Sequence, residues 1–197
     1  MDTDDFVDTV SSENETALSR LGSSKALYAI TEGEMEEDVV LASAATTVHH
    51  VAETVGDWDG EVFVAAGETA GEQYETITGK LDSHEPGERS AALATLSEQD
   101  GPAARLGGFV GWTLVAKKTF EQLTGFFVGQ ADPQTSQVFR EMGSDVEDLR
   151  EQALDALADA DDRGAAEAAA TAVVQAAYED DYVATLEALG VNPKNVC

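Results

Sequence analysis

The sequence predicts an all-α protein in which residues 1–197 form a single domain, a bundle of about six helices. Its four prolines divide the chain into long blocks that are rich in Ala, Leu and Glu, residues that favour helices. Apolar residues recur every three or four positions within these blocks, which is the period of one helix face. The only strand-like runs, Val39-Val40 and Val62-Phe63-Val64, are too short and too isolated to build a sheet.

The first three helices are expected at residues about 2–31, 34–57 and 61–82. Acidic residues open the first two, beginning at Asp2 and Glu34, where they complement the positive end of the helix dipole. Gly33 and Gly60 follow the same two helices and mark the turns after them. The third helix carries its apolar and acidic residues on opposite sides, so we expect an ordinary amphipathic helix.

A connector is expected over residues 83–102, with room for a short helix near 91–96. The helix after it, about 103–129, carries large apolar side chains on most sides. Because only a helix surrounded by others can bury so many of them, we expect it at the centre of the bundle. It completes a set of core helices between about 2 and 129.

Two further helices are expected to be appended to this core, within residues about 132–190. Asp132-Pro133 is an N-cap followed by a proline at the first helical position, so one helix starts there and runs to about 160. A polar break at 161–164 introduces the last helix, about 165–189.

Two pairs of glycines in the central helix are spaced four residues apart, Gly107 with Gly111 and Gly125 with Gly129. This spacing lets a neighbouring helix approach closely, either inside the bundle or across a dimer. It is the basis of one functional alternative, a dimeric scaffold protein whose last two helices extend the interface.

The chain has 39 Asp and Glu residues against 11 Lys and Arg, so its formal net charge is −28. The acids are spread along the whole chain, which is typical of proteins from salt-accumulating halophiles. We interpret the charge as a solvation device and expect folding to need salt, because salt screens the self-repulsion of the compact state. The alternative, a polyanion that mimics nucleic acid, would favour one acidic block.

The same composition limits the partners and the location. Arg105, Lys117 and Lys118 form the only net-positive stretch, too little for the phosphate contacts of nucleic acids, so we expect internal charge pairing and no direct nucleic-acid binding. Leu106–Ala116, the longest uncharged run of the apolar region, is too short to span a membrane. The start MDTDDFVDTV has no features of a secretory signal, and the only cysteine, Cys197, rules out an internal disulfide. We therefore expect a cytoplasmic protein.

Several common catalytic motifs are absent from the sequence. There is no Gly-x-x-x-x-Gly-Lys phosphate loop, no Gly-x-Ser-x-Gly nucleophile motif and no His-Glu-x-x-His zinc motif. Di-iron bundles use Glu-x-x-His pairs, because this spacing aims both side chains into one core layer. No Glu stands three residues before His49, His50 or His84, so these pairs are missing.

Five residues remain as candidate metal ligands: Glu13, His49, His50, Glu53 and Glu121. Glu13 falls within the apolar stripe of the first helix, where an unpaired charge is costly, so it either binds a metal or reaches solvent or a basic partner at the rim. His50 and Glu53 share a polar face of the second helix. His49 flanks the apolar face, as a ligand or as a boundary histidine. Glu121 lies one turn after Lys117, which indicates an ion pair within the helix as the alternative to a ligand role.

Two segments, LSRLGSSKALYAITEGEM (18–35) and GGFVGWTLVAKKTFEQLTGFFVGQADPQT (107–135), resemble a haloarchaeal family described as rubrerythrin-like or ferritin-like, members of which also carry a transcription-antitermination label. The resemblance covers residues about 1–157. It implies a ferritin-like up-down bundle, here with the C-terminal helices appended. Rubrerythrins proper join a di-iron bundle to a Cys-rich rubredoxin module and reduce peroxide, and the single Cys197 excludes that module. Of the family's ligands only Glu13 carries over, while His49 and Glu53 are near-misses.

We therefore expect a non-catalytic binding or regulatory module with an incomplete di-iron site, which acts through a protein partner or self-association. We expect no cofactor, with iron as the alternative. The competing hypothesis is a metal-dependent oxidoreductase of peroxide or iron chemistry, whose carboxylate-rich ligand set is drawn from the five candidates. The dimeric scaffold is the third.

Overall fold

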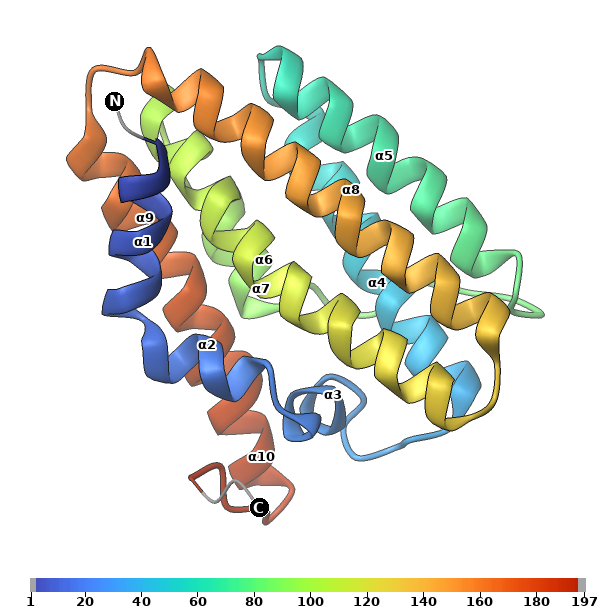
Figure 1. The fold of residues 1–197 in the computed structure, drawn as a ribbon. Coiled ribbons are helices and arrows are strands. Elements are labelled where there is room, and N and C mark those ends of the chain that lie inside the picture. The colour runs from blue at the N-terminus through green and yellow to red at the C-terminus, as the bar shows by residue number, and fades with distance from the viewer. Residues whose placement is uncertain (1–2, 195–197) are drawn as a thin grey trace.

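Four long helices form the centre of the protein: α4 (Glu37–Gly56), α5 (Glu61–Thr78), α7 (Pro102–Gly129) and α8 (Pro133–Ala158). The structure is a computed structural model that describes residues 3–194, and every regular element in that range is a helix, which confirms the all-α class. Figure 1 shows α4 antiparallel to α5 and α7 antiparallel to α8, each pair packed as a hairpin.

A single long crossover, residues 79–101, joins the two hairpins and contains the short helix α6 (Ala91–Ser97). It returns the chain along the length of the bundle, so α5 and α7 run in the same direction (Figure 1). The bounds predicted for these five helices agree with the structure to within a few residues. Proline and glycine set most of them: Pro102 and Pro133 each stand at a helix start, and Gly60 precedes α5 with a φ of 134°.

The single helix predicted at about 2–31 is wrong: the segment forms three short helices, α1 (Thr3–Glu13), α2 (Glu15–Leu21) and α3 (Ser24–Ile30). The first break is at Asn14, whose buried side chain donates to the Val10 carbonyl at 2.8 Å and to the Thr171 hydroxyl at 3.2 Å. An Asn that bonds to nearby backbone competes with the helix. The second break is at Ser23, whose backbone is extended.

The buried position of Asn14 also shows that Glu13 does not lie within the buried stripe of the helix, contrary to the prediction. Val10 of α1 and Asn14, the residue directly after α1, lie on the side that packs against the neighbouring helix α9, and Gln175 of α9 donates to the Asn14 side-chain oxygen at 2.6 Å. Glu13 ends α1 one position earlier and is exposed. Of the two interpretations of Glu13, the solvent-reaching one therefore agrees with the structure, and its place within a buried stripe does not.

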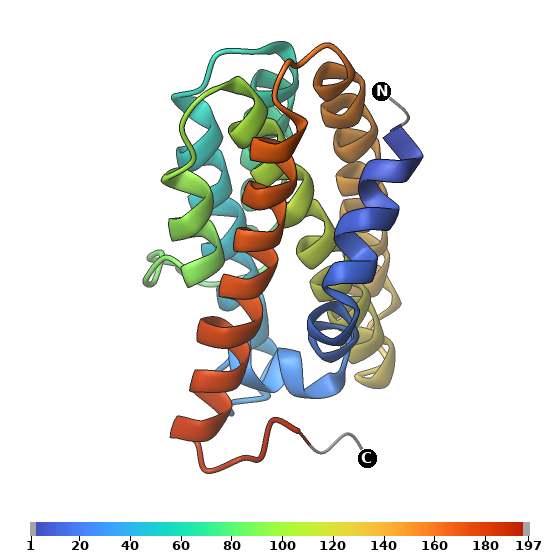
Figure 2. The ribbon, with the colours of Figure 1, turned by 90° about the vertical axis from the view of Figure 1, so that its left-hand side faces the viewer.

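The last helix predicted, about 165–189, is three consecutive helical segments: α9 (Arg163–Ala176), the π-helix η1 (Ala177–Ala184) and α10 (Thr185–Ala188). They form one rod against the crossover face of the bundle (Figure 2). The π-helical turn within it was not predicted. Such turns are rare and often occur at functional sites, because the extra residue per turn changes the direction of the side chains that follow.

The close approach of α9 to α7 accounts for one glycine pair. A Cβ added at Gly107 or Gly111 would overlap the backbone of Ala166 or Ala170, so the first pair serves packing inside the chain. A Cβ at Gly125 or Gly129 would meet nothing within 4 Å.

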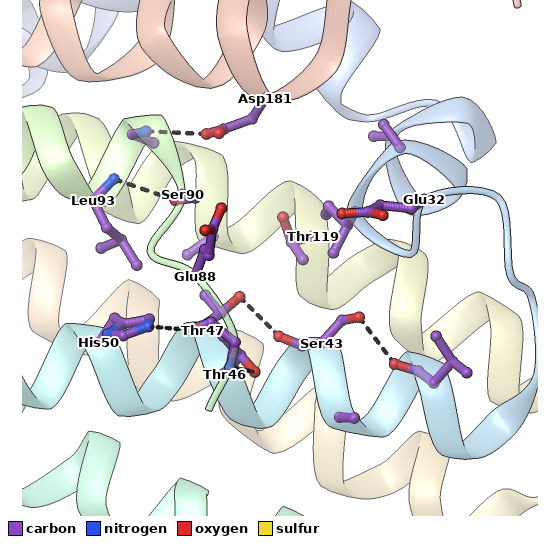
Figure 3. A pocket seen from close by; sticks show the side chains of 18 of the residues that line it. Glu32, Ser43, Thr46, Thr47, His50, Glu88, Ser90, Leu93, Thr119 and Asp181 are labelled. Atoms are coloured by element: carbon purple, nitrogen blue, oxygen red, sulfur yellow. Dashed lines mark hydrogen bonds between the residues drawn. The ribbon is translucent and has the colours of Figure 1, made fainter. Parts of the chain in front are cut away.

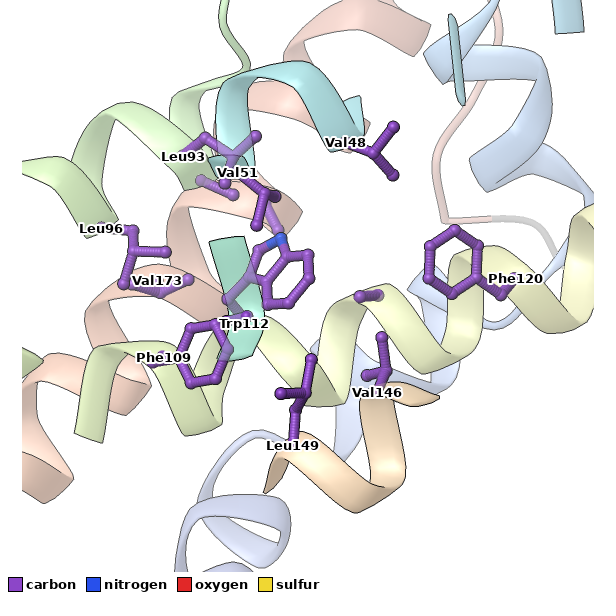
Figure 4. Close-up of a cluster of buried hydrophobic side chains, with 14 of the residues drawn as sticks. Val48, Val51, Leu93, Leu96, Phe109, Trp112, Phe120, Val146, Leu149 and Val173 are labelled. Atoms are coloured by element: carbon purple, nitrogen blue, oxygen red, sulfur yellow. The ribbon is translucent and has the colours of Figure 1, made fainter. Parts of the chain in front are cut away.

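The core lies where α4, α6, α7, α8 and α9 meet, and Figure 4 shows that apolar side chains fill it. The residues labelled there are Val48, Val51, Leu93, Leu96, Phe109, Trp112, Phe120, Val146, Leu149 and Val173. Helix α7 is buried without interruption from Leu106 to Thr113, which confirms its predicted central place. Among the described side chains, the buried polar ones are Asn, Gln, Ser and Thr, with no carboxylate and no histidine.

No helix within residues 3–194 is both long and apolar enough to cross a membrane. Cys197 and the predicted helix start at Asp2 lie outside the described residues.

Candidate functional site

Helix α4 brings His49, His50 and Glu53 together on its crossover side. His50 and Glu53, three residues apart, place Nδ1 and Oε2 2.9 Å from each other. His49 and Glu53, four residues apart, place Nε2 and Oε1 3.5 Å from each other. Among the described residues, these three are the group of His, Cys, Asp and Glu side chains whose donor atoms are near enough for a metal, all within 4.8 Å of one another.

The crossover lies directly beside this cluster and is tied to it. The Nε2 of His50 donates to the carbonyl oxygen of Gly87 at 2.9 Å, and the amide of Gly87 donates to the Thr46 hydroxyl at 3.2 Å. Arg89 donates from Nη2 to Glu53 Oε2 at 3.3 Å. The cluster is thus built from one helix and held from outside by a second segment, which is how metal ligands are commonly oriented.

A third histidine, His84, lies beside the cluster, and no pattern in the sequence predicts this position. His84 Nε2 lies 3.5 Å from the Thr46 hydroxyl. The Tyr74 ring of α5 lies near both His49 and His84: its centroid is 5.4 Å from that of the His49 ring and 5.8 Å from that of the His84 ring. His84 stands in the connector, where no periodic pattern relates it to α4. Its contact with Thr46 depends on the path of the crossover.

The charges of the cluster shift two of its groups. The hydrogen bond from His50 is the main reason that the pKa of Glu53 is lowered; burial opposes it, and the charge of His49 and the hydrogen bond from Arg89 lower the pKa further. Glu53 is therefore an ionised carboxylate. Burial lowers the pKa of His84, and the nearby charge of His49 lowers it further.

The two other predicted ligands are not part of this group. Glu13 is exposed on α1. The ion pair predicted between Glu121 and Lys117 does not form: Glu121 pairs within α7 with Lys118, whose Nζ lies 3.7 Å from Oε2. Lys117 instead reaches Glu147 of α8 at 2.9 Å, because the α7–α8 hairpin brings that acid closer than the next turn of its own helix.

The basic stretch of α7 is paired internally, as expected for Lys117 and Lys118, while Arg105 differs. The Arg105 guanidinium lies 5.3 Å from the centre of the Trp58 ring and donates to the carbonyl of Gln99 at 3.2 Å. An aromatic face takes the place of the acidic neighbour that we expected.

A di-iron centre of the rubrerythrin kind does not fit the described residues. Such a centre needs carboxylates and histidines that project from facing helices into the bundle. The interior between the two hairpins is occupied by valine, leucine, phenylalanine and tryptophan side chains (Figure 4). The histidines of the chain lie outside that interior, between α4, α5 and the crossover.

A cleft of about 810 Å³ adjoins the histidine cluster and shares His50 with it. Its walls are α3, α4, the crossover, α6, α7 and η1. Figure 3 shows Thr46, Thr47 and His50 on the α4 side, opposite Asp181, with Leu93 and Thr119 between them. The deeper wall is apolar and includes Trp112, Val115 and Phe120.

The described lining of the cleft carries acidic residues but no Lys or Arg. Its acidic lining residues are Glu32, Asp38, Asp82, Glu85, Glu88 and Asp181.

Asp181 is the least exposed of the acidic residues whose pKa the structure shifts, and its position depends on the π-helix η1. Its two carboxylate oxygens accept hydrogen bonds from the backbone amides of Ala91 at 2.7 Å and Ala92 at 3.0 Å, at the start of α6. Burial raises the pKa of Asp181 and outweighs these two hydrogen bonds, which lower it. Sequence reasoning missed this residue, since a π-helical turn leaves no signature in the apolar period.

The chain matches no protein-family model, no curated protein and no solved structure, so its function has to be argued from these two features, the histidine cluster and the cleft.

Proposed function

We propose that this protein is a non-catalytic binding module with a ferritin-like scaffold, and that the cleft beside α4 holds its ligand. The scaffold proposal rests on topology, because two antiparallel hairpins joined by one long crossover are the arrangement of ferritin-like folds. It is also what the resemblance of segments 18–35 and 107–135 to that family implies. The apolar interior supports a scaffold without the interior metal site of rubrerythrins proper.

The ligand site is inferred from three properties of the cleft taken together: its size, its apolar wall and the negative charge of its lining. A cleft of about 810 Å³ falls in the range of small-molecule sites. Trp112, Val115 and Phe120 offer an apolar surface, and the hydroxyls of Thr46 and Thr47 offer hydrogen bonds. With six acids and no Lys or Arg in the lining, an anionic ligand would be repelled. The ligand is thus a small organic molecule with an apolar body and a neutral or cationic end.

The two alternatives have less support. An oxidoreductase whose carboxylate ligands include Glu13 and Glu121 would need these two residues beside the histidines, and both lie elsewhere. A dimeric scaffold was based on the glycine pairs, and the pair Gly107 and Gly111 packs against α9 of the same chain. Self-association through the second pair is tested by light scattering in molar KCl, where a concentration-independent monomer would end that idea.

We also infer that the module works in a salt-rich cytoplasm, as a halophilic, archaeal-type protein. The support is the net charge of −28, with acidic residues spread along the whole chain, which gives a compact state that needs screening. A regulatory role would then be transmitted to a protein partner and not to nucleic acid, because Lys117 and Lys118 are engaged in ion pairs.

The test uses three probes with the same apolar body and different ends: 4-phenylbutylammonium, 4-phenylbutanol and 4-phenylbutyrate. The chain has two tryptophans, so Trp58→Phe leaves Trp112, in the cleft wall, as the only reporter of fluorescence. We expect the cation and the alcohol to give saturable changes in Trp112 emission and the anion to bind at least about tenfold more weakly, measured at the lowest KCl concentration at which the protein stays folded, so that the charge of the lining is screened as little as possible.

Two variants separate the cleft from unspecific binding. Ala42→Phe in the α4 wall should fill part of the cleft and weaken binding at least about tenfold. Val64→Phe changes an exposed residue of α5 outside the cleft and should leave binding unchanged. Binding of the anion as tight as that of the cation would overturn the ligand class. Failure of all three probes to bind folded protein, or equal effects of the two variants, would overturn the site.

A further inference from the structure

We propose that His49, His50 and Glu53 form a three-ligand site for a divalent transition metal of the zinc class, on the outer face of α4 and separate from the interior position of a di-iron centre. The site does not depend on the proposed ligand cleft: it uses a different set of side chains, and His50 alone borders both.

The spacing of the donor atoms fits a tetrahedral ion. Zinc–nitrogen and zinc–oxygen bonds of about 2.0–2.1 Å in tetrahedral geometry place neighbouring ligand atoms about 3.4 Å apart. His50 Nδ1 lies 2.9 Å from Glu53 Oε2 and His49 Nε2 lies 3.5 Å from Glu53 Oε1, and one ligand atom from each of the three side chains lies within 4.8 Å of the other two. One helix supplies all three ligands: Glu53 lies three residues after His50 and four residues after His49, the two spacings at which helical side chains meet. The carboxylate therefore contacts both imidazoles, and small side-chain rotations suffice to close the three around an ion.

The surrounding contacts already orient two of the ligands. The Gly87 carbonyl accepts from His50 Nε2, so this nitrogen carries the hydrogen in the metal-bound form and Nδ1 is the ligand atom. Arg89 donates to Oε2 of Glu53 and leaves Oε1 toward His49. A histidine whose second nitrogen donates to a backbone carbonyl and a carboxylate held by a second donor are both typical supports of a metal site.

The donor types determine the class of ion. Two imidazoles and one carboxylate suit Zn²⁺, Ni²⁺ or Cu²⁺, whereas Mg²⁺ and Ca²⁺ prefer all-oxygen ligands. The fourth position is open to water, since Glu53 is 48% exposed and His49 32% exposed. An ion can therefore enter from solvent, drawn by a protein of net charge −28.

The experiment is calorimetric titration of ZnCl₂ into the full chain in about 2 M potassium nitrate, which screens the protein's charge without supplying chloride as a competing ligand. We expect one Zn²⁺ per chain with a Kd on the order of micromolar, and no comparable binding of Mg²⁺. Co²⁺ provides a second readout, because its absorption spectrum distinguishes tetrahedral from octahedral coordination. Equal heats for Mg²⁺ and Zn²⁺ would show only general attraction of cations to an acidic protein and would overturn the site.

Matched variants assign the ligands. Glu53→Gln and His49→Gln keep side-chain size and should each weaken Zn²⁺ binding about 10–100-fold, while circular dichroism shows an unchanged fold. His84→Gln is the control, because His84 neighbours the cluster without belonging to it. Unchanged affinity in Glu53→Gln, or an equal loss in His84→Gln, would overturn this ligand set. Failure of the 4-phenylbutyl probes leaves the metal result unaffected, so the two proposals fail separately.

Discussion

The Nε2 of His50 donates to the carbonyl oxygen of Gly87 at 2.9 Å, and this bond fastens the crossover to α4 where the cleft and the histidine cluster meet. Thr46, one turn earlier on the helix, accepts from the amide of the same glycine at 3.2 Å. Two consecutive turns of α4 therefore bind both backbone polar groups of Gly87, its carbonyl and its amide. Residues 79–90 have no regular structure of their own, so these side chains replace the missing backbone hydrogen bonds.

The first prediction concerns this attachment. His50→Ala removes the bond to Gly87 and should cost about 0.5–1.5 kcal/mol of the free energy of unfolding. Hydrogen exchange should rise in residues 82–90 and stay the same in α7, because the crossover loses its hold while the core is untouched. Thr47→Ala is the control, since the Thr47 hydroxyl bonds to the Ser43 carbonyl within α4. Exchange in 82–90 that rises equally in both variants would contradict the role of His50.

The second prediction contrasts two glycines of α7. Gly107→Ala places a methyl group into the backbone of Ala166, so α9 must move away, at a cost of about 1–3 kcal/mol or more. Gly125→Ala meets nothing within 4 Å and should stabilise the helix by about 0.5–1 kcal/mol. Urea unfolding of the two variants in high salt measures both effects. A stabilising Gly107→Ala would mean that α7 and α9 do not approach as closely as the structure has them.

The sequence predicted the long helices well where local chemistry defines them. Pro102 and Pro133 fix two helix starts and Gly60 the turn before α5, and each acts within a few residues of its position in the chain. The break at Asn14 could not be predicted, because the apolar period continues through it. That break depends on Thr171 and Gln175, more than 150 residues away, and the placement of Glu13 failed with it.

The candidate site divides in the same way. His50 and Glu53 could be placed on one face of the second predicted helix from the sequence, since spacing along one helix decides which side chains meet. His49 was assigned to the edge of the apolar face, and only the structure shows its contact with Glu53. The ion pair predicted between Lys117 and Glu121 is wrong, because Lys117 binds Glu147 of α8 and Glu121 pairs with Lys118 instead. His84 and Asp181 reach the site through the crossover and the π-helix, two features with no periodic signal.

The third prediction tests the interpretation of the charge. Raising KCl from about 0.1 M to about 3 M should raise the Tm of the protein, because the Debye length falls from about 10 Å to less than 3 Å. Glu68, Glu72 and Glu75 stand exposed on one side of α5, where like charges at helical spacing repel. Changing all three to Gln should raise Tm in low salt and reduce its salt dependence. An unchanged salt slope in this variant would attribute the effect of KCl to hydrophobic burial instead.

The fourth prediction concerns the pH dependence of stability that Asp181 contributes. Burial raises the pKa of Asp181 above its ordinary value of 3.8, so between that value and the raised one the folded state keeps a proton that the unfolded state has lost. The contribution of Asp181 to stability is therefore fully present below pH 3.8 and is lost as the pH rises through the folded-state pKa.

Asp181→Asn is neutral at every pH and keeps one oxygen to accept from Ala91 or Ala92. The stability of the wild type relative to this variant, measured by urea unfolding in high salt, should thus fall as the pH rises from about 4 to about 7. Glu68→Gln, an exposed acid on α5, serves as the comparison and should show a much smaller trend. A relative stability of Asp181→Asn that is flat, or that moves in the opposite direction, would mean that the two amide hydrogen bonds and not burial determine the ionisation of Asp181.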